Sequence, residues 1–392
     1  MLISDKKDPV QRLLDKKRYF KKEINVALFE YCSNNCSFCF QGNDDRTNLN
    51  PIIIGMKAKL ICDLIEEEPN KNLALKIFGG ELFENTVKDE HIEAYKTFMV
   101  KISDKCKELG KTLDIIMVTN LLNTRIDRIE KLVKDVRDLG INVNLAASFD
   151  LLGRFHNQNS LDLFMKNVMH FKNDIKSINM VITKNNIDIL LGRKENKEVS
   201  TREAFDTLYN EGFSIACDYY NPDLESCHIE MPSDTDLLDF YYYAIDNYPK
   251  IMPVNCWVSG RESDLSCEAT IGISSRGRVR NCRDTSVDCP DLFWSEDNHK
   301  DNSAIENSFV KRHNCLTCKY YTRCTMGCFL FFDFKYREHY EECIFSHIFH
   351  YLETGEKTYG KLIPVPEKLK KLSQSLRRKV VEGEFELNAG SN

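Results

Sequence analysis

Residues 24–39 read INVALFEYCSNNCSFC, a β-rich run that leads directly into three closely spaced cysteines. The β-branched and apolar content of 24–29 predicts a strand. The spacing C-x3-C-x2-C then places Cys32, Cys36 and Cys39 on the loop that follows. Thiolates are the usual protein ligands of iron–sulfur clusters. Three of them would bind three irons of a four-iron cluster and leave the fourth iron open to a small molecule.

Zinc is the alternative metal for these thiols. A structural zinc site is tetrahedral and needs four ligands, of which this loop supplies three. The nearest candidate for a fourth ligand is Cys62. The spacing leaves both metals open, and a zinc-stabilised binding protein without chemistry is therefore one functional alternative.

Strand-like and helix-like stretches alternate from residue 24 to about residue 220. After the first strand, strands are predicted at 73–78, 113–118, 143–147, 178–182 and 213–216, and helices at 56–67, 91–109, 125–139, 161–171 and 201–209. This alternation indicates repeated βα units and a parallel sheet. Six units predict an α/β fold, a partial (β/α)6 TIM-like barrel, whose active face is formed by the loops at the carboxyl ends of the strands.

The composition excludes several classes of protein. The chain has 392 residues, of which 42% are hydrophobic and 29% charged, and a formal net charge of −6. This acidic balance without a long basic run argues against a nucleic-acid binder. The N-terminus is charged and lacks the apolar core of a secretory signal, and no apolar run is long enough for a membrane helix. We therefore expect a cytoplasmic protein with no membrane contact.

Twelve of the sixteen cysteines lie in two groups, which points to metal binding in a reducing compartment. The second group occupies the less regular region from about residue 256 to 345. Its central members are Cys267, Cys282, Cys315, Cys318, Cys324, Cys328 and Cys343, with Cys256 and Cys289 nearby. Residues 267–282 predict a β-hairpin that turns near 275–277 and brings its two flanking thiols together.

The first cysteine loop, with aromatic Phe38 before its last cysteine, resembles that of the radical SAM family. The resemblance implies that the open iron is chelated by the amino and carboxylate groups of S-adenosylmethionine. One electron from the cluster then cleaves the sulfonium and yields a 5′-deoxyadenosyl radical that abstracts hydrogen from a substrate. The cofactor carries this step, while the protein positions it and excludes solvent.

Further motifs support this resemblance. Gly79, Gly80 and Glu81 end the second predicted strand and are similar to the family's GGE element, whose backbone contacts the methionyl amino group. Two glycines let the backbone approach a ligand closely. Leu82 follows where related enzymes usually have proline.

Polar residues at the ends of the next two strands resemble positions that contact ribose or methionyl groups in the family. They are Thr119, Asn120, Ser148 and Asp150. The arginine that many relatives place about ten residues after the Ser-x-Asp element is missing here. Arg154 is the nearest candidate for the carboxylate contact, which stays open.

The second cysteine group resembles the SPASM extension of a subset of radical SAM enzymes. The resemblance implies two auxiliary four-iron clusters, and hence three clusters in all. The outer cluster would use Cys315, Cys318, Cys324 and Cys343, and the inner one Cys267, Cys282 and Cys328. For the fourth ligand of the inner cluster we favour Cys256 over Cys289, and an open iron is the other possibility.

The predicted organisation has five parts: an N-terminal helical segment (1–23), the barrel (24–220), a connector (221–255), the auxiliary-cluster domain (256–350), and a C-terminal helix and tail (351–392). Enzymes of similar architecture mostly modify peptides. We therefore expect oxidative peptide maturation, by cross-linking or thioether formation in a ribosomally made precursor. The alternative is formylglycine formation by a sulfatase-maturing type of enzyme.

Several partners follow from this expectation. They are a peptide or protein substrate and an electron donor such as a flavodoxin or ferredoxin. Only about two dozen residues precede the first strand, too few for a leader-binding domain, so leader recognition would need a separate protein or the C-terminal region. The catalytic acid or base is not identifiable from the sequence.

Overall fold

A computed structural model describes residues 21–39, 49–220, 227–260, 270–280, 315–320, 324 and 343–360. Four of the predicted metal ligands or alternatives lie outside these residues: Cys267, Cys282, Cys289 and Cys328. Most of the predicted N-terminal helical segment and all of the predicted C-terminal helix and tail beyond residue 360 also lie outside. The predicted domain boundaries therefore stay predictions.

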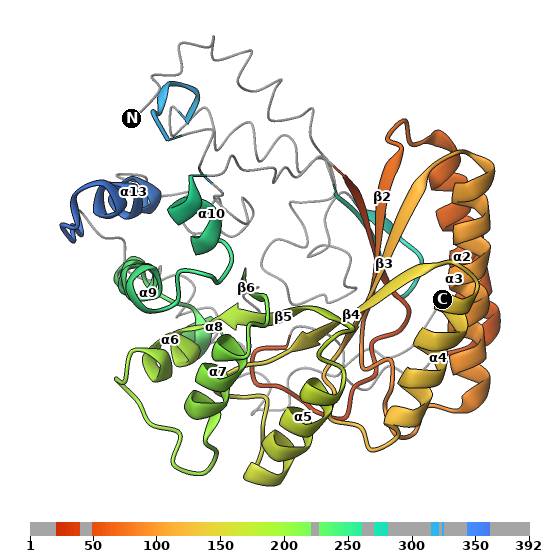
Figure 1. Cartoon of the computed structure of the whole chain (residues 1–392), viewed down its shortest axis with the longest axis horizontal. Helices are drawn as coiled ribbons and strands as arrows, with labels where there is room; N and C mark the ends of the chain where they lie inside the picture. Colours follow the sequence, from red (N-terminus) through yellow and green to blue (C-terminus); the bar gives the residue numbers. More distant parts are fainter. Residues whose placement is uncertain are drawn as a thin grey trace, which may run out of the picture.

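The described chain forms one curled sheet, the open half-barrel predicted from the βα alternation (Figure 1). Its strands are β1 (Lys22–Ala27), β2 (Asn72–Phe78), β3 (Thr112–Thr119), β4 (Asn142–Ser148), β5 (Ile175–Ile182), β6 (Ile215–Tyr219), β7 (Thr270–Ile273) and β8 (Val279–Arg280). They lie in the order β6-β5-β4-β3-β2-β1-β7-β8. All neighbours pair in parallel except β7 and β8, which are antiparallel.

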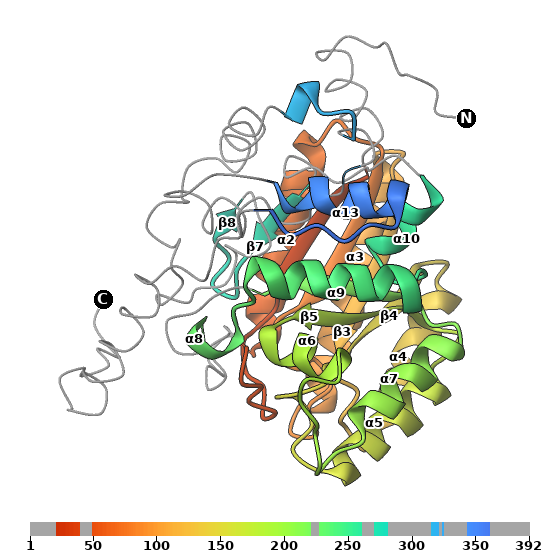
Figure 2. The same ribbon diagram turned by 90° about the vertical axis from the view of Figure 1, so that its left-hand side faces the viewer.

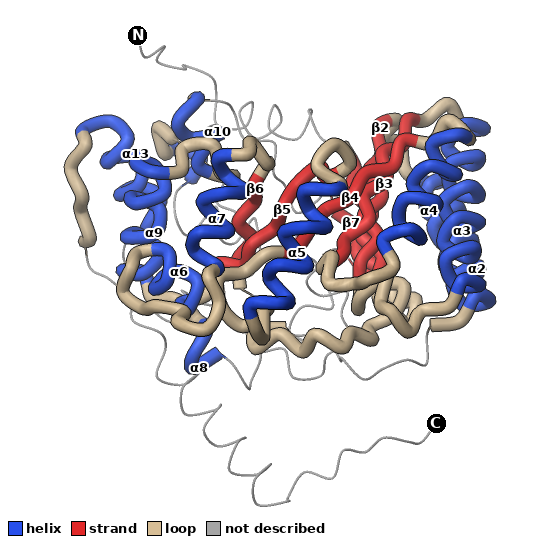
Figure 3. Tube along the Cα trace, turned by 60° about the horizontal axis from the view of Figure 1, so that its bottom comes forward, coloured by secondary structure: helices blue, strands red, loops and turns tan. Residues whose placement is uncertain are grey.

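Five helices follow the strands as predicted and cover the outer face of the sheet: α2 (Pro51–Glu67), α3 (Asp89–Glu108), α4 (Ile126–Asp138), α5 (Gln158–His170) and α7 (Thr201–Asn210). A short helix that was not predicted, α6 (Lys184–Leu190), lies between β5 and α7. After β6 the described chain adds α8 (Cys227–Glu230), α9 (Asp234–Asn247), α10 (Val254–Ser259), a 3-10 turn η2 (Cys315–Thr317) and α13 (Ile344–Thr354). Figures 1 and 3 both show α2, α3 and α4 stacked side by side at one end of the sheet. None of the described helices combines the length and apolarity that crossing a membrane requires.

Local sequence explains where several helices begin. The Asn50 side chain accepts a hydrogen bond from the Ile52 amide at 2.8 Å, and Pro51 occupies the first turn of α2. Asparagine at the N-cap satisfies a free amide, and proline at the first helical position has no amide to satisfy. A capping box formed by Ser233 and Asp236 begins α9 in the same way. These caps fix the ends of helices whose apolar sides face the sheet.

The strands alternate between a buried outer face and a more polar inner face. In β2, Leu75 and Ile77 are fully buried, whereas Lys76 and Phe78 are half-buried. Successive side chains of a strand point to opposite faces, so the first pair packs under the helices and the second faces the barrel interior. The inner face of this half-barrel is therefore available for a polar ligand.

The predicted hairpin is confirmed within residues 270–280, where β7 and β8 pair around a turn closed by a hydrogen bond from Gly277 N to Ser274 O at 2.9 Å. Its position in the sheet was not foreseen: β7 pairs in parallel with β1 and extends the barrel sheet. The Ser275 hydroxyl donates to Glu30 Oε1 at 2.7 Å. The turn is thus tied to the segment that immediately precedes the first cysteine loop.

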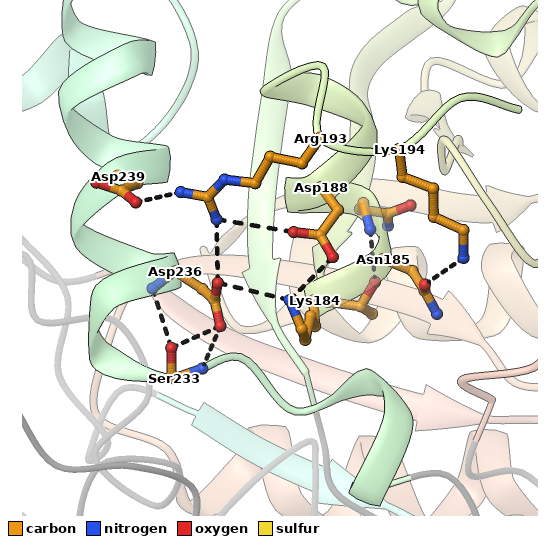
Figure 4. A network of polar contacts seen from close by, with 10 residues as sticks. Lys184, Asn185, Asp188, Arg193, Lys194, Ser233, Asp236 and Asp239 are labelled. Atoms are coloured by element: carbon orange, nitrogen blue, oxygen red, sulfur yellow. Dashed lines mark hydrogen bonds and ion pairs between the residues drawn. The ribbon is translucent and has the colours of Figure 1, made fainter.

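A polar network joins α9 to the barrel helix α6 (Figure 4). Arg193 Nη1 lies 3.1 Å from Asp236 Oδ1 and also contacts Asp239, while Lys184 Nζ lies 2.9 Å from Asp188 Oδ2 and 3.6 Å from Asp236 Oδ1. The Asp236 carboxylate also accepts from the Ser233 amide in the capping box, so it contributes both to the start of α9 and to its contact with the barrel. The connector helix is therefore held against the barrel by several charges at once.

Helix α13 lies beside α9, as Figures 1 and 2 show. The Tyr351 hydroxyl donates to Asp246 Oδ1 at 2.7 Å, and the rings of Tyr320 and Phe349 stack with centroids 4.8 Å apart. The turn around Cys315 and Cys318 therefore rests on α13, which in turn rests on the connector.

Candidate active site

A cavity of about 210 Å³ opens inside the half-barrel, toward the carboxyl ends of β2 to β6. Its walls include the three thiols of the first cysteine loop and most of the predicted cofactor contacts. The predicted residues that line it are Cys32, Cys36, Phe38, Cys39, Gly79, Gly80, Glu81, Thr119, Asn120 and Ser148. Separate segments of the chain that were predicted from local motifs thus meet around one space.

The two glycines of the second loop are required by packing against the cysteine loop. Gly79 and Gly80 have φ values of +101° and +35°. A Cβ atom on Gly79 would lie 2.2 Å from the Phe29 carbonyl oxygen, and one on Gly80 would lie 2.0 Å from that of Tyr31. The Glu81 amide donates to the same Tyr31 oxygen at 2.9 Å. Close approach of backbone to backbone accounts for the glycines, while the predicted contact to a ligand stays a prediction.

Glu81 joins the ends of two strands. Its buried carboxylate accepts hydrogen bonds from the Thr119 hydroxyl at 2.7 Å, the Asn120 amide at 2.6 Å and the Phe83 amide at 3.0 Å. Burial raises the pKa of Glu81 to about 7, although the bonds from Asn120 and Thr119 oppose the shift. The carboxylate therefore fixes the shape of the cavity wall at the end of β3.

Burial favours the neutral form of the thiols in the first cysteine loop. It raises the pKa of Cys32 to about 12, and it also raises the pKa of Cys36, where the charge of Arg154 opposes it. Asn34 Nδ2 donates to Cys36 Sγ at 3.2 Å. A metal deprotonates the thiols that bind it, and hydrogen bonds to sulfur are typical around iron–sulfur clusters.

The donor set of this loop fits a sulfur-ligated metal group. Its three cysteines are thiols that line one cavity, and one of them already accepts a hydrogen bond from an amide. Within the part of the chain that the structure describes, no three His, Cys, Asp or Glu side chains are arranged to hold a metal ion as they stand. Cys32, Cys36 and Cys39 are the residues that would hold a cluster.

Asp150 lies beside the cavity and not in its wall. Its Oδ2 atom lies 2.7 Å from Arg154 Nε, and its Oδ1 atom accepts from the Val181 amide and from Asn186 Nδ2, each at 2.9 Å. Burial raises the pKa of Asp150 to about 6, which the charge of Arg154 opposes. Arg154 itself does line the cavity. A direct contact of Asp150 with a cofactor stays a prediction, whereas its contact with Arg154 is a feature of the fold.

The inner faces of the strands add polar residues that the motifs did not identify. Lys76, Asn179 and Asp218 line the same cavity, and Asn179 Nδ2 donates to Asp218 Oδ2 at 3.3 Å. Each lies between two buried residues of its strand. Alternation along those strands was the signal that could have revealed them, because a polar residue at an inward position of a barrel strand faces its interior.

The second cysteine group is described only in part. Cys315 and Cys324 are buried, and Cys318 and Cys343 are partly buried. Burial raises the pKa of Cys343 to about 11, with a further contribution from the neighbouring Cys318. Cys256 lies on α10. The four cysteines that the sequence assigns to the outer cluster therefore all lie in the described residues as thiols, and their ligand roles stay predictions.

Neither a protein-family model nor a curated protein matches this sequence. Solved structures do match its fold. The structure of native anSMEcpe, an anaerobic sulfatase-maturing enzyme, with bound AdoMet aligns with a TM-score of 0.54 at 14% identity, over 90% of this chain and 100% of that chain. A histidine-tagged form of the same enzyme with AdoMet gives a TM-score of 0.52 at 14% identity, over 90% and 99% of the two chains. The likeness is one of fold.

Proposed function

We propose that this chain is a radical SAM enzyme that oxidatively modifies a peptide. The observation that carries the proposal is the convergence of Cys32, Cys36 and Cys39 with the Gly79–Gly80 loop on one cavity at the active face of a half-barrel. A four-iron cluster with S-adenosylmethionine would supply there an electron and a carbon-centred radical able to abstract hydrogen. The chain itself supplies the three thiols, a rigid wall and a partly apolar enclosure.

Different residues of the cavity would position the cofactor in different ways. The glycine loop presents its backbone to the cavity, because its φ values and its contact with Tyr31 leave no room for side chains. Glu81 holds the end of β3 by accepting hydrogen bonds from the Thr119 hydroxyl and the Asn120 backbone amide, which keeps both residues in the cavity wall. Among the residues that the structure describes, the cavity opens on the inner side of the half-barrel, where a peptide would enter. A wall held in place in this way is expected of a site that positions a cofactor.

The second cysteine group supports an oxidative reaction on the peptide. Removing a hydrogen atom and a further electron from a substrate requires an electron acceptor, which the proposed auxiliary clusters would provide, the outer one on Cys315, Cys318, Cys324 and Cys343. The initial electron would come from a flavodoxin or ferredoxin. Cross-linking or thioether formation in a ribosomal precursor is the proposed reaction, with a separate leader-binding protein if the precursor carries a leader.

A first experiment tests the metal group and the cleavage reaction together. The protein is purified and reconstituted without oxygen, and iron, sulfide, zinc and 5′-deoxyadenosine are measured after addition of S-adenosylmethionine and dithionite. We expect about twelve irons, and about eight with no 5′-deoxyadenosine in a Cys32/Cys36/Cys39→Ala variant. A Cys106/Cys217→Ala variant, which removes two buried thiols outside the two groups, is the control and should match the wild type. Zinc without sulfide would instead identify a zinc-stabilised binding protein.

A sulfatase-maturing activity is the second candidate, because the fold matches anSMEcpe over nearly its whole length. The two activities are distinguished by the peptide that the enzyme modifies. A short sulfatase peptide with a reactive Cys, incubated with reduced enzyme and S-adenosylmethionine, would lose its sulfur and two hydrogens and gain one oxygen on conversion to formylglycine. A precursor peptide would instead lose two hydrogens for each cross-link and keep all its sulfur. Mass spectrometry of both peptides distinguishes the two activities.

A further inference from the structure

The loop that follows β4 clasps the first cysteine loop. Ser37 N donates to Gly153 O at 3.2 Å, and a Cβ atom on Gly153 would lie only 2.3 Å from Ser37 Oγ. Asn34 Nδ2 donates to Arg154 O at 3.1 Å, and His156 Nε2 lies 2.6 Å from Asn34 O. Three residues of one loop thus hold the other loop on both sides of Cys36.

This clasp places a buried cation against the cysteine loop. The Arg154 side chain is 11% exposed, and its guanidinium carbon lies 5.5 Å from the centre of the Phe38 ring, between two of the cysteines in sequence. The guanidinium pairs with Asp150 at 2.7 Å, and an arginine side chain stays protonated in proteins. The positive charge is therefore permanent.

Asp150 fixes this cation in place. Its carboxylate is completely buried and is held by two further donors, the Val181 amide and Asn186 Nδ2, so that it cannot follow Arg154 if the guanidinium moves. The other carboxylates near the loop face different groups. Glu81 holds the end of β3, and Glu230 Oε1 accepts from the Ser37 hydroxyl at 2.9 Å.

We propose that Arg154, held by Asp150, is a positioning residue that raises the reduction potential of the cluster on Cys32, Cys36 and Cys39. A positive charge in a low-dielectric site stabilises the reduced cluster, which carries one more negative charge than the oxidised form. Asp150 partly offsets this charge. The inference rests on the proposed function, because it requires a four-iron cluster at this loop.

The alternative use of Arg154 is to bind the carboxylate of S-adenosylmethionine. The geometry favours the role toward the cluster, because Asp150 already occupies Nε and the guanidinium faces the ring of Phe38. The two roles differ in one measurable respect. An effect on the potential is present without S-adenosylmethionine, whereas loss of a carboxylate contact appears only in its binding.

The test is a redox titration of the reconstituted full-length protein, followed by electron paramagnetic resonance without S-adenosylmethionine. The signal of the first cluster is the one that disappears in the Cys32/Cys36/Cys39→Ala variant. Arg154→Gln should shift its midpoint to more negative potential, and Asp150→Asn should shift it to more positive potential. Arg154→Lys, which keeps the charge, should restore most of the change. Arg128→Gln is the control. It removes a similarly buried arginine of α4 that pairs with Asp89 of α3, and it should leave the midpoint potential unchanged.

Opposite shifts in Arg154→Gln and Asp150→Asn support the proposal, because a merely loosened loop would move both variants in the same direction. Shifts of the same sign, or an unchanged midpoint in Arg154→Gln at wild-type iron content, overturn it. If Arg154→Gln loses its iron, the other two variants still test the proposal. A more positive midpoint in Asp150→Asn, with little change in Arg154→Lys, supports it, and a more negative midpoint in Asp150→Asn overturns it. An unchanged midpoint with weakened S-adenosylmethionine binding assigns Arg154 to the carboxylate. Absence of any first-cluster signal in the wild type refutes the proposed function itself.

Discussion

Substituting Gly80 by alanine tests the packing of the cavity wall most directly. The new Cβ atom would lie 2.0 Å from the Tyr31 carbonyl oxygen and 2.8 Å from its carbonyl carbon. These are backbone atoms of the cysteine loop, which cannot rotate away as a flexible side chain would. The residue also has a φ of +35°, in the left-handed region that L side chains rarely adopt. Relief of the clash therefore requires the two loops to separate.

The expected cost has two parts. A left-handed conformation costs an alanine about 1–2 kcal/mol relative to glycine. Forcing an extra methyl group into a packed interior costs about 1–3 kcal/mol more. Gly80→Ala should therefore lower the free energy of unfolding by about 2–5 kcal/mol. Gly140→Ala is the matched control, since Gly140 has a φ of +73° and no atom within 4 Å of the place that its new methyl group would take, and it should cost only the first part.

Urea unfolding of the reduced, metal-free protein, followed by circular dichroism, measures both variants against the wild type. Iron content after reconstitution gives a second readout, because loops that separate also move Cys32 away from its partners. We expect Gly80→Ala to be less stable than Gly140→Ala and to bind less iron at the first loop. Equal midpoints for the two alanine variants would refute the assignment of the glycine to backbone packing.

Three further predictions concern the surroundings of the site. Burial raises the pKa of Glu81 from 4.5 to about 7, so the folded state holds this proton more tightly than the unfolded state. The free energy of unfolding of the wild type should therefore fall by up to about 3 kcal/mol between pH 4.5 and 7, relative to that of Glu81→Gln. An equal pH dependence of the two free energies across this range would contradict the prediction. Tyr241→Phe removes a hydroxyl that lies 2.5 Å from that of Tyr219 between β6 and α9, and should cost about 1 kcal/mol in thermal unfolding. Asp236→Ala removes the carboxylate that accepts from Ser233 in the capping box of α9 and that contacts Arg193, and should cost about 1–3 kcal/mol. Asp104→Ala at an exposed site should change stability by less than about 0.5 kcal/mol.

Much of the barrel could be predicted from the sequence because its signals are local. The strand over 24–29 and the helices that follow each strand are encoded by periods of two and 3.6 residues, which depend only on near neighbours. The thiols of Cys32, Cys36 and Cys39 share one short loop, so their convergence needs no tertiary information. The GGE element was found for the same reason, as a glycine pair at the end of a strand.

The roles of single residues were less accessible. The ligand contact of Gly79 and Gly80 stays a prediction, and the structure adds that carbonyl groups about fifty residues earlier in the chain leave no room for a side chain at these positions. The cofactor contact of Asp150 also stays a prediction, and the structure adds its ion pair with Arg154. These added roles depend on which groups approach from another segment of the chain. No local pattern reports that approach.

The sequence by itself therefore determined the order of βα units, the cysteine loop and the chemistry that thiols imply. Only the tertiary structure decided that β7 pairs with β1, that Lys76 and Asp218 face one cavity, and that Arg154 lies against Phe38 of the cysteine loop. The physical reason is the range of the interactions. Strand pairing and burial of a charge join residues that are far apart in the chain, and their energies depend on distances that exist only once the sheet has curled.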